Sequence, residues 1–154
     1  MTITLTPIGI VHSPFLNPED VGKERNTNPD GFRDVQGKIE LFKEYERGLA
    51  DIDGFSHLFI LFHFHRAQES RLIAHPPHGN KERGVFSTRS PRRPNALGLT
   101  VVKQLDRKDN ILYIADLDMI EGTPVLDIKP YTLREQKANL SLGWLEPYLD
   151  VYEK

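Results

Sequence analysis

The feature that most constrains the fold is a series of short β-forming stretches joined by polar, turn-rich connections. The most apolar of them, SHLFILFHFHR (residues 56–66), has the composition of a buried strand. The others are residues 4–13, 37–42, 97–105, 111–120 and 121–131. Strands do not alternate with helices, which argues against a doubly wound fold. The pattern predicts an antiparallel barrel or sandwich.

The connections differ in length and character. Residues 14–37 are polar, rich in Pro, Gly, Asn and Asp, and show no periodicity. We therefore expect a long loop there, which in a compact domain is either functional or disordered. Residues 43–55 predict a short helix or turn that stops at Gly54, and DRKDN (106–110) predicts a hairpin turn. A helix is expected within the tail, residues 133–154.

Composition limits the class of protein. With 154 residues, 38% of them hydrophobic, the chain suits one domain spanning residues 1–154. It has no run of 18 apolar residues and no basic, apolar leader, so we expect neither a membrane span nor a signal peptide. Cysteine is absent, which excludes disulfides and cysteine–zinc sites and fits a cytoplasmic location. Because the net charge is −2, any nucleic acid must be attracted by a local patch.

Such a patch is predicted in STRSPRRPN, residues 87–95, which we call the arginine corner. The Ser-Pro and Arg-Pro steps disfavour helix and hold Arg89, Arg92 and Arg93 on a stiff turn. A guanidinium group binds carboxylate or phosphate best when its side chain is held in place in advance. A solvated basic turn without function is the alternative.

The histidines near residue 60 raise the possibility of a metal. On a continuous strand, His63 and His65 lie on the same face, which is one way to begin a metal site. No third ligand stands out, so we predict no metal and expect both rings at the end of a barrel. A metal-dependent hydrolase that uses this pair is kept as an alternative.

Acidic residues follow two of the expected strands. Asp116 and Asp118 share a face, where they would hydrogen-bond ribose hydroxyls or amines, or serve only as charges on an edge strand. Residues 124–131 alternate, placing an acid, a base and a phenol together against two apolar anchors: Val125, Asp127, Lys129 and Tyr131 on one face, Leu126 and Ile128 on the other. No glycine-rich phosphate loop is present. The residues alone predict a β domain for an anionic or nucleotide-like ligand and leave the reaction open.

Four segments, in order along the chain, carry a resemblance to a known family. They are IGIVHSPF (8–15), DGFSHLFILFHFHR (53–66), GVFSTRSPRRPNALGLTVV (84–102) and DLDMIEGTPVLDIKPY (116–131). Together they resemble the YaeB-like (TsaA) family. Its characterised members are dimeric S-adenosylmethionine-dependent tRNA methyltransferases that modify N6 of threonylcarbamoyladenosine beside the anticodon. The resemblance implies a mainly β fold, a single closed or nearly closed antiparallel barrel with a few short helices.

The resemblance also implies a set of cofactor contacts. They come from the loop before residue 37, the end of the central strand, the arginine corner and the acidic segment: Asn28, Pro29, Asp30, Gly31, His65, Arg66, Arg89, Leu99, Ala115, Asp116, Leu117 and Asp118. An arginine would hold the methionine carboxylate, and an aspartate would accept from ribose or the amino group.

We predict direct transfer of the methyl group to N6 on a tRNA substrate, by a cytoplasmic homodimer. A base would help remove the N6 proton, and Asp127, Tyr131 and His65 are the candidates. Arg92, Arg93 and Lys129 are predicted to contact RNA phosphate. A non-catalytic barrel that binds nucleotide or RNA through the arginine corner is the main alternative.

Overall fold

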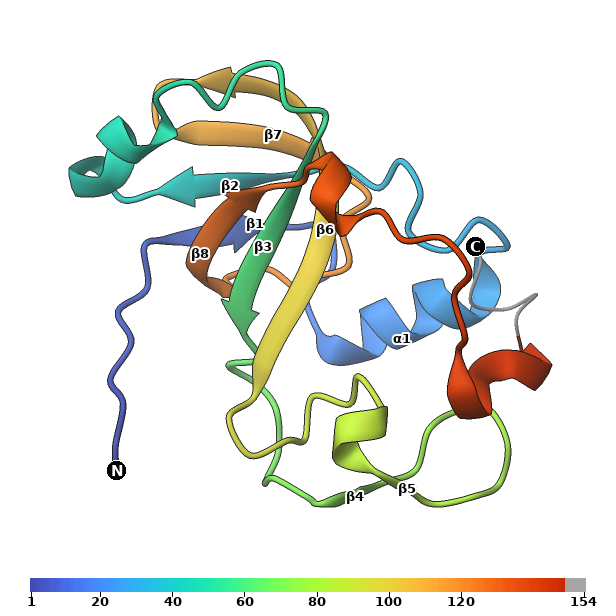
Figure 1. Ribbon diagram of the computed structural model, residues 1–154. Coiled ribbons are helices and arrows are strands. Elements are labelled where there is room, and N and C mark those ends of the chain that lie inside the picture. Colours follow the sequence, from blue (N-terminus) through green and yellow to red (C-terminus); the bar gives the residue numbers. More distant parts are fainter. Residues whose placement is uncertain (149–154) are drawn as a thin grey trace.

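The computed structural model describes residues 1–148 and consists mainly of strands, six of which close into an antiparallel barrel in the order β1-β2-β7-β6-β3-β8 (Figure 1). The barrel strands are β1 (Gly9–His12), β2 (Gly37–Leu41), β3 (His57–His63), β6 (Leu97–Lys108), β7 (Ile111–Ala115) and β8 (Pro124–Pro130). The predicted closed barrel is confirmed. Most strands are shorter than expected, β1 most of all, whereas β6 is longer and runs to Lys108, into the predicted 106–110 turn.

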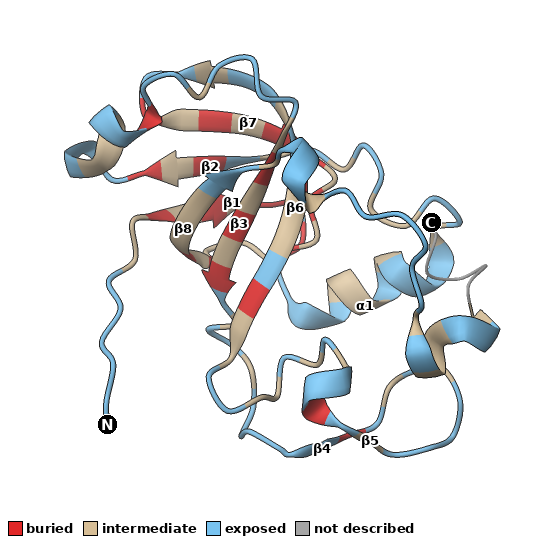
Figure 2. Ribbon diagram, viewed as in Figure 1, coloured by how far each residue is buried: buried red, intermediate tan, exposed pale blue. Residues whose placement is uncertain are grey.

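The hydrophobic core lies inside the barrel, and every barrel strand contributes buried residues to it. Figure 2 shows buried segments in red on the barrel strands. In β3, Leu58, Ile60 and Phe62 are buried, as the alternation of that stretch predicts. Gly98 on β6 lies opposite Phe62, and a β-carbon there would overlap the Phe62 ring. The other buried core residues are Val11, Ile39, Leu41, Leu49, Val102, Leu112, Ile114, Leu117, Met119 and Val125.

The predicted faces of β8 are correct for Asp127, Ile128 and Lys129. They are wrong for Val125, because a bulge interrupts this strand. Leu61 pairs with Asp127, but the next residue, Phe62, pairs with Val125. One extra residue reverses the alternation. Val125 is therefore buried in the core, whereas Asp127 lies on the outer face beside outward-facing Leu61.

The predicted loop over residues 14–37 is also wrong in part, since it contains helix α1 (Pro18–Thr27). Asn17 and Asp20 form a capping box, and Pro18 occupies the first helical turn. No residue of α1 is buried. The helix therefore lacks the apolar face by which periodicity reveals a helix.

The smaller elements follow the predictions more closely. Residues 43–55 contain the 3-10 helix η1 (Lys43–Leu49), and the hairpin turn has Asp109 at φ 54°. The polar connection after β3 holds the short strands β4 (Ile73–Ala74) and β5 (Arg83–Gly84), followed by η2 (Val85–Ser87). The tail holds η3 (Leu133–Glu135) and η4 (Gly143–Tyr148), and its last six residues lie outside the described part. No described helix has the length and apolarity to cross a membrane.

The strand order brings three long connections to one end of the barrel, which we call the loop end. β1, β3 and β7 finish there, and β2, β6 and β8 begin there, because every neighbouring pair is antiparallel. The loop end thus carries residues 13–36, 64–96 and 116–123. In Figure 1, α1 and the β4–β5 unit lie below this end.

Candidate functional site at the loop end

Residues 116–118 form the centre of the loop end and are tied to the connection that follows α1. Asp34 donates its backbone N–H to Asp116 Oδ1 at 2.9 Å, and Leu117 N–H donates to the Val35 carbonyl at 3.1 Å. Asp116 has φ 65°, in the left-handed region that is unfavourable for a residue other than glycine. Backbone held in this way is common at binding sites.

Asp118 is the most unusual polar group of this segment. Its Oδ1 is buried and has no hydrogen-bond partner among residues 1–148. Burial raises the pKa of the Asp118 carboxyl, and a hydrogen bond from Thr100 and the charges of Arg25 and Arg89 partly offset that rise. Asp118 is thus influenced by side chains from α1, the arginine corner and β6.

The turn after α1 borders this group. Asn28 ends the helix and accepts the Asp30 N–H at its Oδ1, at 2.9 Å, while Gly31 has φ 63°. Phe32 follows, with Arg25 Cζ 5.9 Å from its ring centroid. The predicted residues Asn28–Gly31 and Ala115–Asp118 thus belong to adjoining parts of the loop end.

His65 and Arg66 lie just beyond β3, because that strand ends at His63. The expectation that His63 and His65 share a strand face is therefore wrong. Burial, together with the charges of His63 and Arg66, lowers the pKa of His65. A β-carbon at Gly122 would lie 4.0 Å from His65 Nε2, so the ring borders the 116–123 connection. Arg66 Nη1 donates to Leu16 O at 2.9 Å and so fastens the entry to α1.

The arginine corner uses its three arginines differently. Arg93 Nη1 donates to the carbonyls of Thr88 and Ser90, at 3.0 and 3.2 Å, and so holds the turn together. Arg89 is exposed and close enough to Asp118 to affect its pKa. The guanidinium of Arg92 makes no hydrogen bond or ion pair within the described residues.

Four of the predicted residues lie apart from this group. Leu99 is 59% exposed on the outer face of the barrel, opposite Leu61. Asp127 faces outward and forms an ion pair with Lys129 at 2.9 Å. Tyr131 donates its backbone N–H to His57 O and packs on Phe59, at the opposite end of β3. The structure therefore separates Asp127 and Tyr131 from His65.

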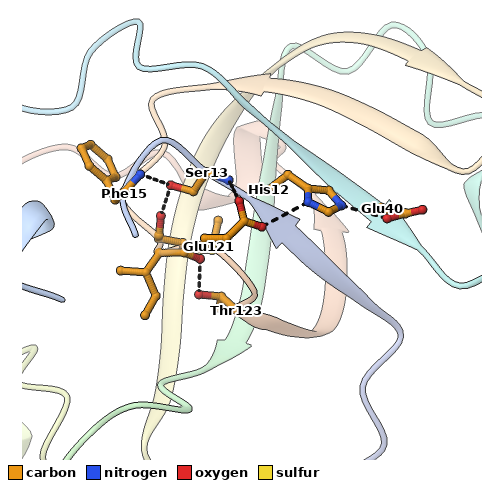
Figure 3. Close-up of polar contacts among 8 residues, drawn as sticks. His12, Ser13, Phe15, Glu40, Glu121 and Thr123 are labelled. Atoms are coloured by element: carbon orange, nitrogen blue, oxygen red, sulfur yellow. Dashed lines mark hydrogen bonds and ion pairs between the residues drawn. The ribbon is translucent and has the colours of Figure 1, made fainter. Parts of the chain in front are cut away.

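Sequence reasoning missed several residues at the loop end. Arg25 lies in a stretch expected to be a loop, and Thr100 lacks any motif, although it lies on the inward parity of its strand beside Gly98 and Val102. The third omission is His12, whose ring lies between Glu40 and Glu121 (Figure 3). The bond to Glu40, partly offset by burial and supported by Glu121, raises the pKa of His12.

Metal ligands do not gather in the described part of the chain. No group of three or more His, Asp or Glu side chains within residues 1–148 is arranged to hold a metal ion. The prediction that no metal is required stays a prediction, for which chelation is the test.

Comparisons of this chain with known proteins agree on one family. Residues 10–135 match the family described as the tRNA-methyltransferase O N-terminal domain. A protein of Pyrococcus abyssi named "Probable S-adenosyl-L-methionine-binding protein" is 43% identical, over 100% of this chain and 82% of its own length. A mouse tRNA (adenine(37)-N6)-methyltransferase is 42% identical over 81% of this chain.

Solved structures agree with this family. The crystal structure of TrmO from Pseudomonas aeruginosa has a TM-score of 0.74 and 30% sequence identity, over 94% of this chain. This chain spans 63% of that protein and 30% of the mouse enzyme, but 82% of the archaeal relative. The likeness therefore covers nearly all of this chain and only part of the larger relatives.

Proposed function

The chain belongs to the tRNA-methyltransferase O family, and on that premise we propose that it is an S-adenosylmethionine-dependent methyltransferase acting on N6 of a tRNA adenine. The observation that carries the proposal is the buried Asp118 carboxylate at the loop end, with one unpartnered oxygen and two arginines in its field. Buried polar groups are nearly always hydrogen-bonded, so an unpartnered one suggests a ligand that supplies the donor.

The residues at the loop end fit the chemistry of S-adenosylmethionine. This cofactor carries a carboxylate, a sulfonium, an ammonium and ribose hydroxyls, and it supplies an electrophilic methyl group. Arg89 is exposed and suited to the carboxylate, with a planar pair of donors. Asp118 is suited to an ammonium, amino or hydroxyl donor. Asn28–Gly31 and Ala115–Asp118 form the adjoining loops that would enclose it.

Catalysis of this transfer depends mainly on positioning. The loop end would hold the methyl donor while the adenine N6 approaches in line, so that the reaction becomes effectively unimolecular. The N6 proton must also be removed. Of the three predicted bases, His65 alone lies at the loop end, and its lowered pKa keeps it neutral and able to accept a proton at physiological pH.

We propose that the adenine modified is that of threonylcarbamoyladenosine beside the anticodon, as the family resemblance implies. Binding of an anionic RNA is supported by the charge of the 64–96 connection, which has seven arginine and lysine residues against two glutamates. This local excess contrasts with the net charge of −2 for the whole chain. Arg92 is the best-placed phosphate contact because its guanidinium has no described partner, whereas Arg93 already holds the turn.

A homodimer in the cytoplasm completes the proposal. On the outer faces of β3 and β6, two successive cross-strand pairs are apolar: Phe59 opposite Val101, and Leu61 opposite Leu99. Such an outer face is suited to a second copy of the chain. Because Leu99 lies on this face, a cofactor contact by Leu99 would be made across the dimer.

Calorimetric titration tests the cofactor site and separates the two leading functions. Wild-type protein is titrated with S-adenosylmethionine and with adenosine monophosphate. We expect binding of the former, at least tenfold tighter than the latter. A protein that binds nucleotide or RNA but not S-adenosylmethionine would be the non-catalytic barrel, and the proposed function would be wrong.

A further inference from the structure

His12, the last residue of β1, bridges two carboxylates from separate parts of the fold (Figure 3). Its Nε2 lies 2.8 Å from Glu40 Oε2 on β2, and its Nδ1 lies 3.1 Å from Glu121 Oε1 in the 116–123 connection. All three side chains are 40–42% exposed, so the bridge is accessible to solvent protons. Neither His12 nor its partners belong to the cofactor residues predicted above.

Glu121 joins this bridge to the backbone of the loop end. Its second oxygen accepts the Ser13 N–H at 3.2 Å, and its own N–H donates to the Phe15 carbonyl at 2.7 Å. The next residue, Gly122, donates its N–H to Val11 O at 2.8 Å. The connection is therefore fastened to β1 and its extension at the point where Glu121 meets His12.

The same connection carries the strained and buried acids of the proposed cofactor site. Asp118 precedes Glu121 by three residues, and Asp116 precedes it by five. The left-handed conformation of Asp116 persists only while the surrounding structure holds it. A restraint at Glu121 therefore limits where both acids can lie.

We infer that His12 is a positioning residue of the cofactor site, which acts through Glu121 on the 116–123 connection and does so most firmly when its ring is protonated. The expected effect on cofactor binding rests on the proposed function. The restraint of the 116–123 connection by His12 does not. His12 would not touch cofactor or substrate.

Protonation of His12 affects the bridge because it changes the number of hydrogen bonds that the ring can donate. The imidazolium donates to both carboxylates, whereas the neutral ring donates to one and turns a lone pair toward the other. The charged groups facing His12 are Glu40, Glu121 and Lys38, its cross-strand partner, whose Nζ is turned to the Tyr113 ring at 5.5 Å. The raised pKa of His12 lies above its ordinary value of 6.5. The bridge is complete below that ordinary value and is lost as the pH rises through the raised one.

Two measurements on the same variants test this inference. The first is protection from amide hydrogen exchange at Leu117, Glu121 and Gly122, and the second is S-adenosylmethionine affinity. Each is made at about pH 6 and about pH 8. His12→Gln should lower protection and weaken the affinity about fivefold at the lower pH, the small end of coupling between sites. At the higher pH, where a larger fraction of the His12 rings is neutral, the difference from wild type should be smaller.

Glu121→Gln separates charge from hydrogen bonding, because an amide can still accept from Ser13 but cannot pair with an imidazolium. It should reproduce the effect of His12→Gln, and it carries the same test should that variant fail to fold. His57→Gln is the matched control, since His57 bonds Ser56 at the opposite end of the barrel. It should change nothing.

Equal pH dependence of protection and affinity in wild type, His12→Gln and Glu121→Gln would overturn the inference. A wild-type protein that does not bind S-adenosylmethionine would refute the proposed function instead. In that case the exchange measurement alone decides whether His12 restrains the connection. The two failures are therefore distinguishable.

Discussion

Replacement of Asp118 by asparagine should make the protein more stable and a weaker binder of S-adenosylmethionine. In the wild-type protein, Asp118 Oδ1 is buried without a partner, and burial raises the pKa of the carboxyl. A group with a raised folded pKa contributes less stability as the pH increases from its ordinary value, 3.8, through the folded one. Asparagine resembles the neutral carboxyl and has no such loss.

The magnitude follows from desolvation: a buried polar group without a partner costs about 1–3 kcal/mol and a charged one more, and the amide removes only the part that is due to the charge, so we expect a gain of about 1 kcal/mol or more. For a chain of this size, each kcal/mol corresponds to about 2–4 °C in Tm. The gain should increase as the pH rises from 3.8 through the raised pKa of the folded protein. Binding should weaken by about tenfold or more, because charge-assisted hydrogen bonds contribute about 1.5–3 kcal/mol.

Thermal unfolding across the pH range measures the first effect, and calorimetric titration at a fixed pH above neutral measures the second. Asp127→Asn is the control, since Asp127 lies on the outer face and pairs with Lys129. It should change neither quantity appreciably. A variant at position 118 that loses stability, or that binds S-adenosylmethionine as wild type does, would refute the placement of Asp118 at the cofactor.

Four further predictions concern the arginines, the barrel and metal. Arg89→Ala should weaken S-adenosylmethionine binding about tenfold by calorimetry, whereas Arg47→Ala in η1, at the opposite end, should not; equal effects would remove Arg89 from the site. Arg92→Ala should lower the salt slope of tRNA binding by about one unit with cofactor affinity unchanged, and loss of cofactor affinity alone would reverse that assignment. Gly98→Ala should destabilise the fold by about 1–3 kcal/mol in denaturant titration, because its methyl group would overlap the Phe62 ring, and a neutral result would contradict the packing described here. Chelators should leave methyl transfer unchanged, and activity that is lost on chelation and returns with zinc would overturn the prediction that no metal is required.

The strands could be predicted because they obey a simple periodicity, which indicated a barrel or a sandwich, and the family resemblance indicated the barrel. Leu58, Ile60 and Phe62 alternate with outward residues, and the connections contain the residues that turns require. The inward face of Val125 on β8 could not be predicted in the same way, because the bulge between the Leu61 and Phe62 pairings changes the parity without changing the composition. Helix α1 was not predicted because none of its residues is buried, so it has no apolar face that periodicity could reveal.

The sequence predicted which segments form the candidate site, but not which side chains contact one another there. The family resemblance indicated Asn28–Gly31, Arg89 and Ala115–Asp118, and strand order places these segments at one end of the barrel. Which groups meet depends on side-chain directions in irregular connections, where periodicity gives no information. Thr100 and Arg25 near Asp118, and the bridge from His12 to Glu121, required the structure.

The central claim is that this chain transfers a methyl group from S-adenosylmethionine to N6 of a tRNA adenine. Its most direct test is incubation of the purified protein with S-adenosylmethionine labelled in the methyl group and with tRNA from cells that lack the corresponding enzyme. Nucleosides from the tRNA are then separated and identified by mass spectrometry. We predict label in one nucleoside, N6-methylated threonylcarbamoyladenosine, and about fivefold less label or lower with Asp118→Asn at a cofactor concentration near the wild-type Kd, as a tenfold loss of affinity requires. Tight binding of S-adenosylmethionine with no label in any tRNA nucleoside would contradict the claim.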